Sequence, residues 1–160
     1  LLSVQQLTGV YSPFTVEANY NSEIPAYNIP HTICHELSHL KGYMREDEAN
    51  FVSYLACTYS LDASVRYSGT MLALINCANQ LYASDAELYR RLVSEYYSEG
   101  MLRDLRDYNA YWDSFEGPIE EAVDSMNDNY LKFNKQENGV KSYGMMVDLL
   151  LAYYAKGSAQ

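Results

Sequence analysis

The feature that most constrains this chain is the pentapeptide HELSH at residues 35–39. It places two histidines four positions apart, in a segment that begins at Pro30 and runs to Gly42. Proline suits the first turn of a helix and glycine suits its C-terminal stop, so we predict a helix between these residues. On that helix His35 and His39 lie one turn apart, about 40° from each other around the axis. Two imidazoles so placed can bind the same metal ion.

The rest of the chain favours a mainly α fold (α+β) with a short strand ahead of this helix. The segment FTVEANYN has β-branched and aromatic residues in partial alternation, which predicts one strand near residues 14–20. Start and stop signals further on predict six to seven helices, at about 30–42, 45–60, 63–83, 84–100, 101–115, 118–133 and 143–156. The fourth is predicted to start at Ser84, which forms a capping-box pattern with Glu87. No linker divides the chain, so we expect residues 1–160 to form a single domain.

Composition excludes some partners and structures. The chain has 11 basic and 21 acidic residues, and its net charge of −10 would repel the phosphates of a nucleic acid. Its three cysteines, at 34, 57 and 77, have no close pairing that would indicate a disulfide framework, so each is expected to be a small core residue. The longest apolar run, at 145–155, is too short for a membrane span.

A catalytic zinc site needs a third protein ligand, and the next helix offers carboxylates for it. Glu48 shares an apolar stripe with Val52 and Leu55, which predicts that its side chain points inward. A carboxylate that points inward is costly unless it is paired or binds a cation. We therefore predict Glu48 as the third ligand, with Glu46 as the second choice. The remaining polar residues of this first turn are expected to be solvated.

Three residues are candidates for the chemistry beside the metal. Glu36 follows the first ligand, and in such motifs this glutamate takes a proton from the water that the metal activates. His31 lies two turns from His39, about 12 Å along the axis, which is too far to share one ion. It either faces a substrate cleft, where it could stabilise an oxyanion, or packs at the start of the helix. Tyr143 is the other candidate oxyanion donor.

These motifs resemble those of known protein families. HExxH followed by a glutamate from the next helix is similar to the pattern of the gluzincin metallopeptidases. More closely, four segments resemble a bacterial family of zinc-peptidase-like membrane proteins: PFTVEAN at 13–19, the block at 29–57 around HELSH, RYSG at 66–69, and the block at 127–154 that ends in LLLAYY. The resemblance implies a zincin-like domain with a Zn²⁺ cofactor, acting on a peptide or protein. It also implies transmembrane helices ahead of Leu1. The sequence is compatible with either side of the membrane, and we expect the domain on the extracytoplasmic side.

Two functions follow as hypotheses. The first is a metallopeptidase, in which a zinc-activated water attacks a peptide bond and Glu36 is the general base. The resemblance further implies that the strand in 14–21 is an edge strand, against which an extended peptide substrate lies. The second hypothesis is a non-catalytic zinc-containing domain that binds a partner or acts as a sensor. An open coordination position would favour the first hypothesis, and a fourth protein ligand the second.

Overall fold

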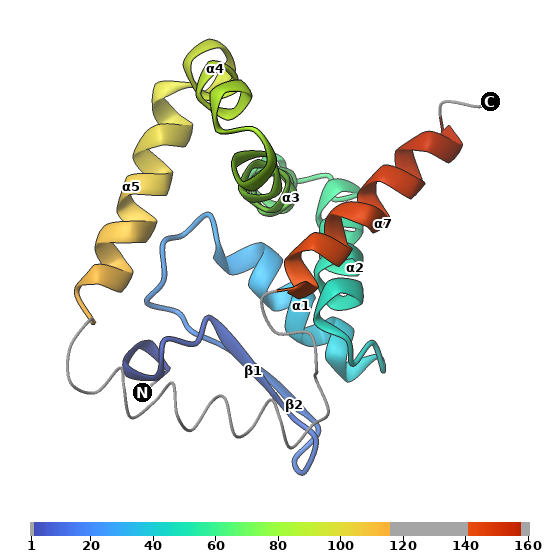
Figure 1. Cartoon of the computed structure of the whole chain (residues 1–160). Helices are drawn as coiled ribbons and strands as arrows, with labels where there is room; N and C mark the ends of the chain where they lie inside the picture. Colours follow the sequence, from blue (N-terminus) through green and yellow to red (C-terminus); the bar gives the residue numbers. More distant parts are fainter. Residues whose placement is uncertain (1, 116–140, 158–160) are drawn as a thin grey trace.

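The computed structural model in Figure 1 describes residues 2–115 and 141–157, with the side chains of 141–143 left out. Within these residues a short 3-10 helix (Ser3–Gln5) and a two-stranded antiparallel sheet precede six α-helices. The predicted mainly α fold with short upstream β structure is thus confirmed. The predicted helix at 118–133 lies outside the described residues.

The β structure is a hairpin. Strand β1 (Gly9–Ser12) pairs with β2 (Glu17–Tyr20) in a register that places Gly9 opposite Tyr20 and Ser12 opposite Glu17. The prediction of one strand near 14–20 is partly wrong, because residues 13–16 form the turn between the two strands. The first strand was missed because its four residues, GVYS, are too few to show an alternating pattern.

Helices α1 (Ile29–Leu40) and α2 (Glu46–Thr58) run antiparallel and in contact. The chain reverses between them at Gly42, whose φ of 98° lies in the left-handed region that glycine tolerates. Hydrogen bonds join the helices at successive levels. At one of these levels the Ser53 hydroxyl donates to the His31 carbonyl oxygen over 2.6 Å.

The next helices are α3 (Ala63–Ser84), α4 (Ala86–Tyr96) and α5 (Glu99–Asp113). The predicted Ser84 cap is wrong by one residue: the Asp85 carboxylate accepts the N–H groups of Glu87 and Leu88 at 3.1 and 2.9 Å. The break between the fourth and fifth helices also comes earlier than predicted, because Ser98 caps α5. Its hydroxyl accepts from the N–H of Met101, so the chain turns before Gly100.

Helix α7 (Lys141–Gly157) packs against α2 and α3. The core here is formed by Tyr54, Met146 and Leu150, with partly buried apolar residues around them. Helix α1 also packs against α2, and the hairpin packs against α1 in turn (Figure 1). Among the described helices, none is both long and apolar enough to cross a membrane.

Candidate metal centre

Three side chains from α1 and α2 bring donor atoms together. The Nε2 atoms of His35 and His39 are 3.0 Å apart. The carboxylate oxygens of Glu46 lie 3.2 Å from Nε2 of His35 and 3.5 Å from Nε2 of His39. A tetrahedral zinc ion with bonds of about 2.0–2.1 Å requires its ligand atoms to be about 3.3 Å apart. The two distances involve different oxygens of Glu46, Oε2 and Oε1, and one donor atom from each residue lies within 4.8 Å of the other two, so this group could hold a metal.

The Nδ1 nitrogen of each imidazole ring, which faces away from the other donor atoms, lies within hydrogen-bond distance of an acceptor. Nδ1 of His35 lies 2.8 Å from the side-chain oxygen of Asn50, and Nδ1 of His39 lies 2.8 Å from the backbone carbonyl oxygen of Tyr43. Because a carbonyl oxygen can only accept, each Nδ1 carries a proton and donates it. Each Nε2 is then the nitrogen available to a metal, and its ring is held in place, as in most histidine–metal sites.

The third donor atom of this group comes from Glu46, the second choice, whereas Glu48, the first choice, lies outside the group. The side chain of Glu48 is 43% exposed, and its carboxylate lies 3.9 Å from the Arg45 guanidinium. The apolar stripe used for the prediction does not face α1. Helix α2 instead turns toward α1 a stripe of polar and small residues that includes Glu46, Asn50 and Ser53.

The expectation of a solvated first turn in α2 is also wrong. Asp47 is 5% exposed and accepts two hydrogen bonds from Arg45, at 3.1 and 2.8 Å. Asn50 is buried and orients His35. Sequence reasoning missed the role of Asn50, although a signal was present. Asn50 follows Glu46 by four residues, so the two share a helix face.

Glu36 lies beneath β1. It is 6% exposed, and a β-carbon added to Gly9 would come within 2.5 Å of its Oε1 atom. The ring of Tyr11, two residues along the same strand, has its centroid 6.3 Å from that of His39. Burial raises the pKa of Glu36 to about 7, with a further contribution from Glu46, while His35 opposes the shift. A carboxyl group with such a pKa can exchange a proton near neutral pH.

The surroundings shift the pKa values of His35 and His39 in opposite directions. Burial lowers the pKa of His35, but the hydrogen bond and the charge of Glu46 outweigh burial, so its pKa is raised. Burial and the neighbouring His35 lower the pKa of His39. The two rings are thus unequal in the metal-free protein, whereas a bound metal requires both in the neutral form.

Of the other two predicted residues, the structure describes the side chain of His31 alone, and His31 lies outside the donor group. His31 is held at the junction of three helices: its N–H donates to Ser68 of α3 over 3.0 Å, and its carbonyl oxygen accepts from Ser53 of α2. Burial, together with the charge of His35, lowers the pKa of its ring to about 4. Tyr143 belongs to α7, but its side chain is outside the described residues, so its role stays a prediction.

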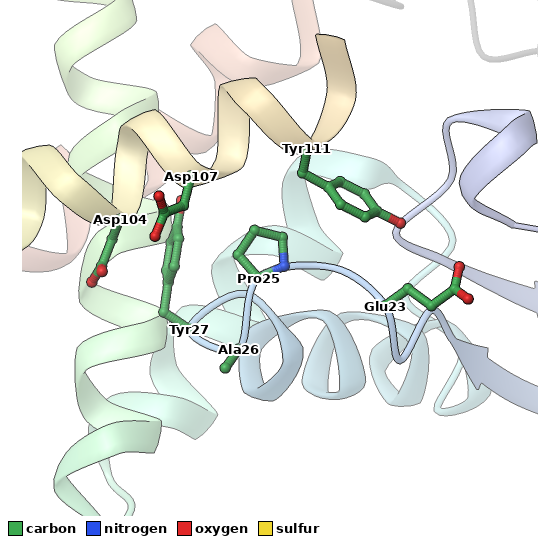
Figure 2. Close-up of a pocket in the computed structure, with 7 residues that line it drawn as sticks. All are labelled: Glu23, Pro25, Ala26, Tyr27, Asp104, Asp107 and Tyr111. Atoms are coloured by element: carbon green, nitrogen blue, oxygen red, sulfur yellow. The ribbon is translucent and has the colours of Figure 1, made fainter. Parts of the chain in front are cut away.

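A separate cavity of about 340 Å³ lies between α5 and the segment that precedes α1 (Figure 2). It contains none of the three donors, and its lining is Glu23, Pro25, Ala26, Tyr27, Asp104, Asp107 and Tyr111. Two of its acidic groups serve the fold. Asp104 accepts a hydrogen bond from Tyr67 over 2.7 Å, and Glu23 accepts one from Ser3. The cavity is thus distinct from the metal centre.

A family model described as a protein of unknown function (DUF3810) matches residues 1–151. No curated protein and no solved structure matches the chain.

Proposed function

The chain belongs to the DUF3810 family, and we propose from its site that it is a zinc-dependent metallopeptidase of the gluzincin kind. The observation that carries this proposal is the convergence of Nε2 of His35, Nε2 of His39 and the Glu46 carboxylate within 4.8 Å of one another. Two imidazoles and one carboxylate make up a common ligand set of catalytic zinc, which leaves a fourth position open. The pattern that resembles the gluzincins supports the same assignment.

Each residue of the centre has a separate task in this proposal. His35, His39 and Glu46 hold the ion, while Asn50 and the Tyr43 carbonyl orient the two rings. When bound, zinc lowers the pKa of water and polarises the carbonyl group under attack. Glu36 takes the proton from the attacking water and passes it to the leaving amine. Burial raises the pKa of Glu36 in the metal-free protein, and a buried carboxyl group beside the metal position is suited to accept a proton and return it.

The substrate is proposed to be an extended peptide that pairs with β1. The N–H of Asn21 donates to the carbonyl oxygen of Thr8 over 2.7 Å, just before the paired residues. In an antiparallel pair the direction of the backbone groups alternates, so those of Gly9 and Tyr11 point away from β2. A strand added there would lie beside Glu36 and His39. The sequence placed this edge on 14–21, and the structure favours β1. Membrane anchoring stays a prediction that rests on the resemblance.

The proposal is tested first by metal content. Protein stripped with a chelator and reloaded with Zn²⁺ is expected to bind one ion per chain. Glu46→Gln is expected to lower zinc affinity at least 10-fold, because it removes a charged ligand. The matched control is Glu48→Gln, two residues along the same helix, which should bind zinc as the wild type does. Equal losses in the two variants would contradict the assignment of Glu46.

The second test is hydrolysis of a peptide library. Glu36→Gln is expected to keep its zinc and to lose roughly 10²–10⁴-fold in kcat/KM, the usual contribution of a general base. Hydrolysis that this substitution leaves unchanged would falsify the role of Glu36.

A non-catalytic zinc domain is the second candidate, and the burial of the centre favours it. Glu36 and His39 are only 6% and 8% exposed, so the hairpin leaves little room for a substrate in this conformation. The two functions differ in one result. Zinc bound at one ion per chain, without hydrolysis of any library peptide, would favour the non-catalytic domain.

A further inference from the structure

The β1–β2 hairpin covers part of the metal centre. A β-carbon added to Gly9 would come within 2.5 Å of Oε1 of Glu36, and the ring centroid of Tyr11 lies 6.3 Å from that of His39. Side chains two positions apart on a strand share one face, so Gly9 and Tyr11 turn the same face of β1 toward α1. Glu36 and His39 are only 6% and 8% exposed. A peptide carbonyl group can therefore approach both side chains only if the hairpin moves.

The hairpin is held on α1 by packing alone. Both of its strands contact α1. Within the part of the chain that the structure describes, residues 9–20 make no hydrogen bond and no ion pair to α1, and their hydrogen bonds lie inside the hairpin. The contact between α1 and α2 is different, because the Ser53 hydroxyl reaches across to the His31 carbonyl oxygen over 2.6 Å. Lifting the hairpin from α1 would therefore break none of the hydrogen bonds of the described residues that hold the helices together.

The two ends of the hairpin are held unequally. At the base, Asn21 follows β2 and is 4% exposed. Its Nδ2 atom lies 3.1 Å from the Ser3 hydroxyl oxygen, 3.2 Å from the Leu7 carbonyl oxygen and 3.2 Å from the Tyr111 hydroxyl oxygen. At the tip, Phe14 is 97% exposed. The base is thus tied to α5 and to the N-terminal segment, whereas the tip projects away from the described helices (Figure 1).

We propose that the hairpin, residues 9–20, is a hinged lid over the metal centre, and that this structure shows the lid closed. It opens by rotation about its anchored base at Asn21, which lifts Gly9 from Glu36 and Tyr11 from His39. A two-stranded hairpin is only marginally stable by itself, so opening is expected to require less free energy than global unfolding. Lid motions of this kind commonly control access to a site.

This inference rests on the metal site of the proposed function, because it takes His35, His39 and Glu46 as the place of the ion. The lid then controls access to that ion and to Glu36. An open lid would admit a peptide to the edge of β1, and closure over the peptide would bring its carbonyl group toward the metal. The burial of the centre is then a property of the closed position and does not exclude a substrate.

The lid is tested first by labelling carboxyl groups of the metal-free protein with a water-soluble carbodiimide and glycinamide, at urea concentrations well below global unfolding. The bulky carbodiimide does not reach the 6% exposed Glu36 while the lid is closed. Opening of the lid exposes little surface, so the labelling rate of Glu36, followed by peptide mass spectrometry, is expected to depend only weakly on urea. A Glu36 rate with the full urea dependence of global unfolding, measured by circular dichroism, would overturn the lid.

A pair of variants then tests which part of the hairpin closes the site. Tyr11→Ala removes the ring that lies over the centre, so the labelling rate of Glu36 should rise about 10-fold. The rate of Asp47, a carboxyl group of α2 that is 5% exposed, should change far less. Phe14→Ala, at the exposed tip, is the matched control and should label Glu36 as the wild type does. Equal labelling of Glu36 in the two variants would contradict the proposal.

Zinc kinetics distinguish a lid from a metal ligand. If the hairpin controls entry, Tyr11→Ala should raise the rates of zinc association and release by a similar factor and change the Kd less than about 3-fold, because access changes while the donors do not. Stopped-flow mixing with a zinc-sensitive dye measures both rates. Faster release with unchanged association would mean that Tyr11 helps to hold the ion, and this result would refute the lid. A chain that binds no zinc would contradict the proposed function, whereas the labelling of Glu36 would still decide whether the hairpin opens.

Discussion

Helix α2 packs against the rest of the molecule through two unlike faces. The face toward α1 carries Glu46, Asn50 and Ser53, whose polar groups contact α1 directly. The face toward α3 and α7 carries Phe51 and Tyr54, which belong to the apolar core. The candidate chemistry therefore lies on a polar face of α2, which a search for apolar periodicity does not identify. The predictions below test whether a substitution on the apolar face changes stability without changing zinc binding, and whether substitutions at the polar centre change zinc binding or its pH dependence.

The largest effect is expected on the apolar face. Met146 of α7 has no exposed surface, so Met146→Ala should lower the free energy of unfolding by about 2–5 kcal/mol, through lost burial and a new cavity. Urea denaturation measures this loss. Zinc binding at temperatures where the variant is folded should be unchanged. Leu151→Ala, at a position 65% exposed on the same helix, should cost less than about 0.5 kcal/mol. A large loss of zinc affinity in Met146→Ala would break the comparison.

The second effect is a pH dependence that originates at Glu36 in the metal-free protein. Its pKa is raised from 4.5 to about 7 on folding, so the folded state binds the proton more tightly than the unfolded state does. The resulting stability is complete below about pH 4.5 and is lost as the pH rises to about 7, by roughly 3 kcal/mol. Chemical denaturation at a series of pH values should show this decline in the wild type and a smaller one in Glu36→Gln. Parallel pH profiles for the two proteins would contradict the assignment.

The third effect concerns the contact between β1 and Glu36. Gly9→Ala would introduce a methyl group 2.5 Å from the Glu36 carboxylate oxygen, so the strand or the carboxylate must move. We expect a loss of about 1–3 kcal/mol in unfolding free energy, together with reduced hydrolysis if the chain is a peptidase. The matched control is Gly100→Ala in α5, where the nearest atom would be 3.8 Å away and alanine favours the helix. An unaltered Gly9→Ala protein would show that the hairpin does not rest on Glu36.

The smallest effect sharpens the comparison within the polar face itself. Asn50→Ala removes the acceptor that orients His35, and such losses typically lower metal affinity about 10–100-fold. Isothermal titration of the stripped protein with Zn²⁺ measures the change. Val52→Ala, on the same helix but outside the polar stripe, serves as the control and should leave zinc affinity unchanged. If Asn50→Ala binds zinc like the wild type, the hydrogen bond does not support the site.

The sequence was informative where a local rule decides the outcome. Pro30 and Gly42 set the limits of α1, and HExxH specified two donors and their common face. The sequence was misleading where tertiary packing decides which side chain faces the neighbouring helix. Glu48 follows the apolar pattern but lies in solvent, and Glu46 points at α1 because of the path of the turn. No pattern in the sequence could give that path.

The hairpin and the polar contacts illustrate the same limit. The strand at Gly9 is too short to be detected by periodicity, yet it covers the glutamate of the motif. Asn50 could have been found by extending the helical-face argument from Glu46 instead of Glu48.

The two imidazoles differ in what a change of sequence can do to them. His35 depends on the side chain of Asn50, which a single substitution removes. His39 depends on the main-chain oxygen of Tyr43, which every amino acid carries. Substitution at position 43 therefore preserves this support as long as the turn keeps its path, whereas inserting or deleting one residue in 41–45 would displace that oxygen and Glu46 together. The length of this turn, more than its composition, is what the centre requires.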